Sequence, residues 1–417
     1  LLADGGGIRG YVLLLILDEL AHAISTYEIK LEAETCQCEH PSSFDPGLLR
    51  LSDYFDYIYG TSTGGITAVM LGRLNMTVKQ SLEVYRGLSS TVFHRRQLVG
   101  YLPFATRYSS KNFEEASRQI VMKYCDGTDV FAKGTNQCHT YVHGSLLQLS
   151  KLTTRRICVT ATHGGEHAYK PFLLRTHTSH LPSVPAPALQ YNRESSKLPI
   201  SGVLRATSAA PCFFKPYSIT LNGKRIRFKD GGIRANNPSQ VAWNEHQGQH
   251  KTNPALLLSI GTGQSEHPKD GFSAGGKPGH IREMVAIWRD IIDKYTSSEI
   301  IHQTMLGIAG GETSWYRRLN PSSGVGDIRL DELKRGLWTD PATGQKRYIP
   351  GGKTLSKMES GTREYLDRDF EGGYETSSPP MDAIHQIAEK LVRLRRAKMS
   401  VGVGVSCSHT DLVCSHD

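Results

Sequence analysis

Three glycine-rich stretches hold the residue types that could do chemistry: "DGGGIRG" at 4–10, "GTSTGG" at 60–65 and "KDGG" at 229–232. The second fits G-x-S-x-G around Ser62, the pattern of a nucleophile elbow, in which a serine lies in a tight turn between a strand and a helix. An apolar run precedes it, and a helical pattern follows from Ile66. Ser62 is therefore expected at a helix N-terminus, where the helix dipole favours developing negative charge.

A serine hydroxyl needs a base to become a nucleophile. The candidate is Asp230, which follows the strand-like run "RIRFK". In an α/β-hydrolase an acidic residue and then a histidine follow the serine, but no later histidine sits in a glycine turn at the end of a clear strand. Those histidines are His246, His250, His267, His280, His302, His385, His409 and His416. The economical interpretation is a Ser62–Asp230 dyad whose carboxylate takes the proton, with its pKa raised by partial desolvation. A Ser–His–Asp triad is the rival.

The opening glycines permit two interpretations. Gly5, Gly7 and Gly10 fit G-x-G-x-x-G, the dinucleotide-binding fingerprint. That fingerprint needs an acidic residue about 20 positions further on, at the end of a second strand. Glu28 is near that distance but lies in a polar stretch without a buried-strand pattern. We therefore expect the loop to aim its N–H groups at an oxyanion.

Composition indicates a globular chain that prefers anionic surfaces. Of the 417 residues 38% are hydrophobic and 21% charged, and the formal net charge is +9. No zinc-finger, RRM or recognition-helix pattern accompanies the basic residues, so we expect no nucleic-acid binding. A lipid surface fits better, against the plainer alternative of a solvated basic face. The short basic clusters are Arg95–Arg96, Arg155–Arg156, Lys224 to Lys229 and Arg393 to Lys398.

The eight cysteines are irregularly spaced and do not resemble a disulfide scaffold. Cys36, Cys38 and His40 could begin a metal site, but no second pair lies at ligand spacing, so we expect reduced thiols and no metal. The longest apolar run, Tyr11 to Leu17, is too short to span a membrane. We expect a cytoplasmic protein, with peripheral membrane association as an option. The first residue, Leu1, lies almost inside a strand, which points to a longer parent chain with further domains.

The order of elements predicts an α/β layer structure with a largely parallel sheet, whose ligands bind at the carboxyl ends of strands. Strands are expected at 54–60, 155–162, 225–232 and 256–263, and helices at 8–24, 66–74, 78–90 and 112–124, with a surface excursion over 28–50. Beyond 265 we expect helical segments at 281–308 and 382–397, edge strands at 315–320 and 327–333, a loop at 334–353 and a disordered tail at 399–417.

The three motifs, in this order and together with "LRATSAAPCFFKP" at 204–216, "DGGIRANNP" at 230–238 and "LLLSIGTG", resemble the patatin-like phospholipase (lipid acyl hydrolase) family. "GTSTGGITAVMLGRLNMTV" is similar to its fungal-type members in particular. The resemblance covers about residues 1–265 and extends loosely to 333. It implies a three-layer fold with a central, largely parallel sheet flanked by helices, and a Ser–Asp dyad without histidine or cofactor. The implied domains are a catalytic domain at 1–333, a loop and helical extension at 334–398, and the tail.

The resemblance also implies residue roles. Ser62 is the nucleophile and Asp230 the general base. Arg9 would lie near a substrate phosphate or, as we favour, support the glycine loop, and Asp4 would hold that loop by hydrogen bonds. The implied oxyanion-hole donors are Gly5, Gly6, Gly7 and Thr63, and the supporting motif residues are Asp4, Arg9, Gly10, Gly60, Gly64, Gly231 and Gly232.

The expected activity is hydrolysis of acyl ester bonds in glycerolipids, above all phospholipids, at a membrane or other lipid surface. The apolar loop "LVGYLPFATRY" at 98–108 would contact lipid, or else is a packed connector. Two alternatives stay open. One is a triacylglycerol or thioester hydrolase with the same dyad, and the other is an N-terminal effector module of a larger signalling or defence protein.

Overall fold

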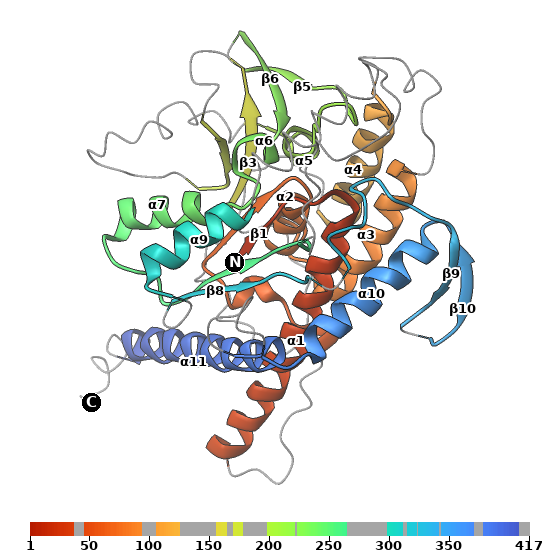
Figure 1. Ribbon diagram of the computed structural model, residues 1–417. Helices are drawn as coiled ribbons and strands as arrows, with labels where there is room; N and C mark the ends of the chain where they lie inside the picture. The colour runs from red at the N-terminus through yellow and green to blue at the C-terminus, as the bar shows by residue number, and fades with distance from the viewer. Residues whose placement is uncertain are drawn as a thin grey trace, which may run out of the picture.

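A computed structural model describes twelve ranges of the chain (Figure 1): residues 1–36, 46–93, 106–125, 156–164, 170–177, 198–221, 223–264, 298–311, 315–322, 324–341, 343–370 and 378–407. The strands are β1 (Leu2–Ala3), β2 (Tyr57–Thr61), β3 (Arg156–His163), β4 (Phe172–Arg175), β5 (Tyr217–Leu221), β6 (Lys224–Asp230), β7 (Leu257–Ile260), β8 (Tyr316–Leu319), β9 (Gly336–Thr339) and β10 (Lys346–Ile349). The helices are α1 (Gly10–Cys36), α2 (Thr63–Ala68), α3 (Val78–Phe93), α4 (Ser110–Tyr124), α5 (Ile200–Thr207), α6 (Gly232–Ala235), α7 (Ser239–His250), α9 (Ser298–Ala309), α10 (Gly352–Asp367) and α11 (Pro380–Cys407).

Within the described residues, eight strands form one sheet in the order β5-β6-β3-β2-β1-β7-β8, with β4 also paired to β3. The pairs from β3 through β2, β1 and β7 to β8 are parallel, whereas β4, β5 and β6 are joined by antiparallel pairs. The expected α/β fold with a largely parallel sheet is therefore confirmed. The short strand β1 lies in the middle, because Leu2 is paired with Tyr59 on one side and Ser259 on the other.

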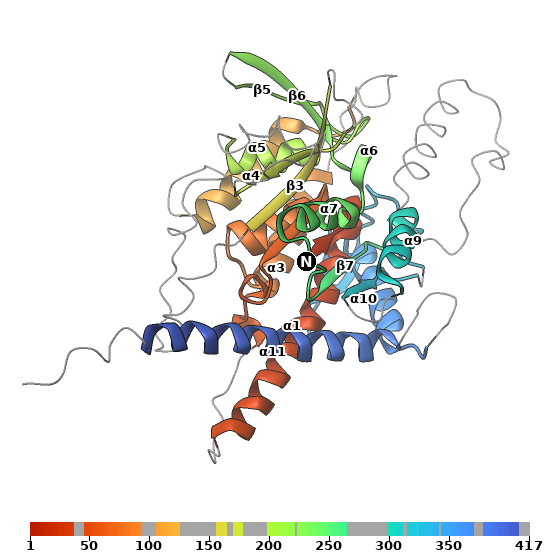
Figure 2. The same cartoon turned by 90° about the vertical axis from the view of Figure 1, so that its left-hand side faces the viewer.

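Two separate cores lie on the two faces of this sheet, which makes the fold three-layered (Figures 1 and 2). Side chains of successive strand residues point to opposite faces. Ala3 accordingly packs in the larger core with α1, α2 and α3, whereas its neighbour Leu2 packs in the smaller core with residues of α7 and α9. The same alternation separates Ile58 from Tyr59.

Strand β6 departs from the expected parallel arrangement. It runs antiparallel to β3, with Ala161 paired to Asp230 and His163 to Phe228. The β5–β6 hairpin projects beyond the sheet (Figures 1 and 2), so β6 returns to the sheet as it ends. Asp230 is its last residue and therefore still arrives near the carboxyl ends of β2 and β3.

Helix α1 is longer than the sequence pattern predicted. It continues past Ile24 to Cys36, through the first part of the expected surface excursion. A long-range contact accompanies this extension, since α11 crosses α1 (Figures 1 and 2) and packs against it around Glu28, while the last turns of α1 project beyond the crossing. At this crossing the carboxylate of Glu28, which is 4% exposed, pairs with Arg395 and Arg396 and accepts a hydrogen bond from the Tyr54 hydroxyl.

The C-terminal third differs from expectation in three places. Residues 334–353, expected as a loop, contain the antiparallel hairpin of β9 and β10. Residues 327–333 form turns rather than an edge strand, whereas 315–320 does supply the edge strand β8. Helix α11 includes residues 399–407, where we expected disorder, and 408–417 lie outside the described residues. Leucine, isoleucine and methionine side chains of α10 and α11 share the larger core with α1, so the extension beyond 333 packs as part of the same body.

We expect Glu28→Ala to lower the free energy of unfolding by about 2 kcal/mol. Removing one partner of a fully buried ion pair costs about 3–5 kcal/mol, and here the two arginines are partly solvated and so lose less. Urea unfolding would measure the difference. Glu34→Ala, at an exposed position on the same helix, is the control and should change stability by less than about 0.5 kcal/mol. Equal effects of the two variants would show that the α1–α11 crossing does not depend on Glu28.

Candidate active site

Ser62 lies in a strained turn between β2 and α2. Its φ of 52° and ψ of −118° fall in a region that residues with side chains rarely adopt. The flanking glycines make the turn possible. A β carbon on Gly60 would lie 2.2 Å from the carbonyl oxygen of Gly64, and one on Gly64 would lie 2.1 Å from that of Ala3. The strand–turn–helix elbow predicted from G-x-S-x-G is therefore present.

The structure brings Ser62 and Asp230 together, as predicted. Strand β3 lies between them, with Thr61 paired to Thr160 on one side and Asp230 paired to Ala161 on the other. This register places both side chains at the same height above the sheet edge. The Ser62 hydroxyl donates a hydrogen bond of 2.7 Å to Asp230 Oδ2. Such a pair can transfer the serine proton to the carboxylate as the oxygen attacks an electrophile.

Burial makes Asp230 a stronger base than a free carboxylate. Its side chain is 7% exposed, and desolvation raises its pKa from 3.8 to about 6. Two hydrogen bonds oppose this rise, one from the Ser62 hydroxyl and one of 2.7 Å from the Gly232 N–H to Oδ1. The carboxylate is thus ionised at neutral pH while its proton affinity stays high.

Thr207 links the nucleophile to the base, a role that sequence reasoning did not assign. Its Oγ1 accepts the Ser62 N–H at 2.8 Å and donates to the Thr160 carbonyl at 2.7 Å. Its own carbonyl accepts the Gly231 N–H at 3.0 Å. The signal that could have indicated this was its place in "LRATSAAPCFFKP", a motif noted for resemblance alone.

The glycine loop lies beside the nucleophile, but not all its N–H groups point outward. A β carbon on Gly5 would lie 3.2 Å from that of Ser62. The Gly5 N–H, however, donates to the Asn236 carbonyl at 3.2 Å, and the Gly6 N–H to Thr63 Oγ1 at 3.1 Å. Among the described residues, no acceptor is found for the N–H groups of Gly7 and Thr63. Of the four expected oxyanion donors, Gly5 and Gly6 thus already donate within the protein, and the roles of Gly7 and Thr63 stay predictions.

Asp4 and Arg9, at the two ends of the glycine loop, both contact later parts of the chain. Asp4 forms a buried ion pair of 2.7 Å with Arg318, and its N–H donates to the Ile260 carbonyl at 3.1 Å. Arg9 Nη1 donates to the Gly326 carbonyl at 2.6 Å, and its supporting role stays a prediction. Gly10 packs against Thr63 and the Tyr85 hydroxyl, and that hydroxyl donates to the Gly7 carbonyl at 2.6 Å.

No histidine in the described part of the chain contacts the dyad. His302 pairs with the Tyr316 hydroxyl beneath α9, and His246 packs against His250 within α7. Four of the histidines considered above, His267, His280, His409 and His416, lie outside the described residues. In the ranges that the structure describes, no cluster of three or more His, Cys, Asp or Glu side chains could hold a metal ion. Cys38 and His40 lie outside those ranges.

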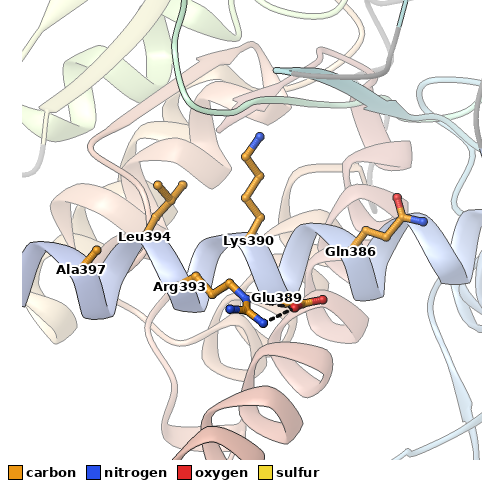
Figure 3. A pocket seen from close by; sticks show the side chains of 6 residues that line it. All are labelled: Gln386, Glu389, Lys390, Arg393, Leu394 and Ala397. Atoms are coloured by element: carbon orange, nitrogen blue, oxygen red, sulfur yellow. Dashed lines mark hydrogen bonds and ion pairs between the residues drawn. The ribbon is translucent and has the colours of Figure 1, made fainter.

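Two further features do not form the catalytic site: a hollow along α11 and the described end of the apolar loop at 98–108. The described residues that line a hollow along α11 all belong to that helix (Figure 3): Gln386, Glu389, Lys390, Arg393, Leu394 and Ala397. It contains neither Ser62 nor Asp230, so it is not the catalytic site. Of the apolar loop at 98–108, residues 98–105 lie outside the described residues. The side chain of Tyr108 is 1% exposed and cannot contact lipid.

A serine–carboxylate pair at the strand ends of a three-layer α/β sheet, next to a glycine loop, defines the class of protein. Residues 1–243 match the patatin-like phospholipase family, and the chain belongs to that family of lipid acyl hydrolases.

The relatives come from animals, plants and bacteria. Human calcium-independent phospholipase A2-gamma is 26% identical over 341 residues, which cover 79% of this chain and 35% of that protein. Patatin-like protein 3 of Arabidopsis thaliana is 28% identical, over 62% of this chain and 57% of its own. The cGAMP-activated phospholipase of Vibrio cholerae is 24% identical, over 73% and 75%.

The chain spans about a third of the length of the phospholipase A2-gamma relatives. The family expected from the motifs is confirmed, whereas the likeness to fungal-type members finds no support in these relatives. None of the described helices is both long enough and apolar enough to cross a bilayer.

We expect Asp230→Asn to raise the free energy of unfolding at about pH 8 by roughly 1–3 kcal/mol. Because the folded-state pKa lies above the ordinary value, the protonated carboxyl stabilises the fold fully below about pH 4. That contribution is lost as the pH rises through about 6, and asparagine cannot ionise. Urea unfolding of the variant and of wild type would show a gain that shrinks towards about pH 4. Asp367→Asn, at an exposed position of α10, is the control. A gain independent of pH would contradict a raised pKa.

Proposed function

We propose that this chain is a serine-dependent lipid acyl hydrolase that cleaves acyl ester bonds of glycerolipids, with phospholipids as the main substrates. The observation that carries the proposal is the buried hydrogen bond of 2.7 Å between Ser62 and Asp230 at the carboxyl edge of the sheet. Membership of the patatin-like family supports it. So do the names of relatives, which include phospholipase A2-gamma and phospholipase A I.

In the proposed first half-reaction, Ser62 Oγ attacks the acyl carbonyl carbon while its proton passes to Asp230 Oδ2. The carbonyl oxygen becomes an oxyanion, which the N–H groups of Gly7 and Thr63 would stabilise. The N-terminus of α2 adds its positive dipole end at the same place. Collapse of the tetrahedral intermediate breaks the ester C–O bond, and Asp230 returns the proton to the leaving alcohol. An acyl ester on Ser62 and a lysolipid result.

The second half-reaction reverses these roles. Asp230 takes a proton from a water molecule, whose oxygen attacks the acyl ester on Ser62. The second tetrahedral intermediate expels Ser62 Oγ, which regains a proton from Asp230, and the fatty acid leaves. Each group returns to its starting protonation state, so the cycle consumes one water per ester bond.

The proposal assigns no catalytic role to a metal. Backbone N–H groups would supply the charge stabilisation that a Lewis acid otherwise provides. The names of the phospholipase A2-gamma relatives, which describe them as calcium-independent, are in keeping with this mechanism.

We further propose that residues 1–333 form the catalytic domain and that 334–398 pack onto it as an extension. A role as an effector module within a larger signalling or defence protein is the second candidate. One observation favours it: the name of the Vibrio cholerae relative, which says that cGAMP activates that protein. Triacylglycerols and thioesters remain alternative substrates, because they need the same residue roles.

A fluorophosphonate probe should label Ser62, as located by peptide mass spectrometry. Ser62→Ala should give no adduct, and Asp230→Asn should slow labelling by about 100-fold or more, since general-base catalysis contributes about 10²–10⁴ in rate. A chelator should have no effect, and Asp367→Asn should label like wild type. Well-folded wild-type protein that takes no label would end the hydrolase proposal. Normal labelling of Asp230→Asn would remove the assigned base.

The value of kcat/KM for a soluble ester should rise with pH through an apparent pKa of about 6 and level off above about pH 7. Only the ionised carboxylate of Asp230 can accept the serine proton, and burial places its pKa at about 6. Initial rates between about pH 4.5 and pH 8.5 would give the profile. A midpoint near 4 would indicate a solvated carboxylate. A midpoint that moves when a histidine is substituted would favour the triad.

A further inference from the structure

The hairpin of β9 and β10 stands out from the body of the molecule beside α10 (Figure 1). Its antiparallel register pairs Leu337 with Tyr348 and Thr339 with Lys346, so these four side chains share one face. Leu337 is 62% exposed and Tyr348 is 65% exposed. Two large apolar side chains thus lie directly opposite each other, in solvent, at the outer surface of a protruding element. We call these four residues the hairpin face.

The opposite side of the hairpin is firmly attached to the body. Trp338 is 6% exposed, and its indole N–H donates to Glu359 of α10 at 2.8 Å. The guanidinium of Arg86 lies 4.9 Å from the centre of the Trp338 ring, and Tyr11 also donates to Glu359. The exposure of the hairpin face is therefore not a sign of a loose segment. The hairpin that carries it is anchored to α10 and α3 through Trp338.

Residues next to this anchor also contact the glycine loop. Tyr85, the neighbour of Arg86 on α3, donates to the Gly7 carbonyl, and Tyr11 lies at the start of α1 directly after the loop. The chain that leads into β9 contributes as well, because the Leu330 carbonyl accepts the Ile8 N–H at 2.9 Å. These shared contacts fix the position of the hairpin relative to the proposed oxyanion site, so a lipid surface bound to the hairpin face would lie at a fixed position relative to that site.

The segment around the hairpin is strongly basic. Residues 334–357 contain six basic residues and one acidic residue: Lys334, Arg335, Lys346, Arg347, Lys353 and Lys357 against Asp340. Two of the basic residues pair with acids, Lys334 with Glu332 and Arg347 with Asp340. Arg335 places its guanidinium 5.7 Å from the centre of the Tyr348 ring. An apolar pair with cations around it matches the boundary between lipid acyl chains and anionic headgroups.

We propose that the hairpin face docks the protein on anionic phospholipid surfaces. Leu337 and the Tyr348 ring enter the acyl boundary, while Lys346 and Arg335 stay at the level of the phosphates, as long cationic side chains do at membrane interfaces. The inference rests on the proposed lipid hydrolase function, and it names the surface through which that function would reach its substrate.

The charge distribution favours lipid over a second copy of the chain. A two-fold interface through this face would bring the same basic segments against each other, and like charges across an interface oppose association. Two other basic clusters fall within the described residues. The cluster at 224–229, on the β5–β6 hairpin, exposes Arg225, Arg227 and Lys229, but no large apolar side chain is exposed beside them among the described residues. The cluster at 393–398 is less available. Arg393 pairs with Glu389, Arg395 and Arg396 pair with Glu28, and Lys398 pairs with Asp56.

Vesicle co-sedimentation would test the proposal, with vesicles of phosphatidylcholine alone and of phosphatidylcholine mixed with phosphatidylglycerol. Wild type should bind the mixed vesicles more tightly, and added salt should weaken that binding. The double variant Leu337→Ser/Tyr348→Ser should bind them at least about tenfold more weakly, because the two apolar groups that would enter the lipid are lost. Lys346→Glu should lower binding to the mixed vesicles alone. Met122→Ser is the matched control, since Met122 is 79% exposed on α4.

The same variants would be assayed on a soluble ester, which separates this proposal from the proposed function. The double variant should keep wild-type turnover of the soluble ester and wild-type unfolding in urea, and should lose hydrolysis of vesicle lipid. If wild type turns over the soluble ester but binds vesicles no more tightly than the double variant, the docking surface alone is overturned. A double variant that changes from dimer to monomer with unchanged vesicle binding would also overturn it. Wild type that binds vesicles through the pair but hydrolyses no ester would overturn the function and leave the docking surface standing.

Discussion

The structure depends on one close backbone contact. The first turn of α2 lies against the end of β1 so closely that a β carbon on Gly64 would come within 2.1 Å of the Ala3 carbonyl oxygen. No side chain fits at this point, so main-chain contact fixes the spacing between the serine elbow and the glycine loop here, and the hydrogen bond from the Gly6 N–H to Thr63 Oγ1 adds to it. A site that must hold a nucleophile and oxyanion donors within ångströms of each other gains from this, because main-chain positions vary less than rotamers do.

Such a contact requires a central strand that cannot move. β1 has only two residues, yet it is paired on both sides, and its two side chains enter the two different cores of the sheet. Just beyond it, the buried pair of Asp4 with Arg318 ties the start of the glycine loop to edge strand β8. Burial raises the pKa of Asp4, and the nearby guanidinium opposes that rise. The ion pair therefore compensates a buried charge whose position holds the loop, which is a structural use of burial distinct from that of Asp230.

Local features of the fold and site were predictable from the sequence, and long-range ones were not. The elbow at Ser62, the turn at Asp230 and the glycine loop follow from short patterns in which glycine spacing and flanking apolar runs suffice. The crossing of α1 and α11 includes the pair of Arg395 with Glu28, two residues 367 positions apart that no local pattern connects. The direction of β6 could not be predicted either. A strand whose last residue lies at the carboxyl edge of the sheet has the same sequence pattern whether it runs parallel or antiparallel to its neighbour. Occupation of the Gly5 and Gly6 N–H groups depends on Asn236 and Thr63, which only the folded chain brings there.

The way in which Asp230 is buried explains how a carboxylate can serve as base without a histidine. Desolvation alone would favour the neutral acid, which cannot accept a proton. The Gly232 N–H and the Ser62 hydroxyl stabilise the anion, and the balance leaves its pKa at about 6. The hydrogen bond that orients the nucleophile thus also keeps the base ionised. When Ser62 transfers its proton, the carboxylate loses that donor and becomes a neutral acid in an apolar setting, where burial favours it. Burial of Asp230 therefore assists the proton transfer itself, and a solvated carboxylate at the same distance would not provide that assistance.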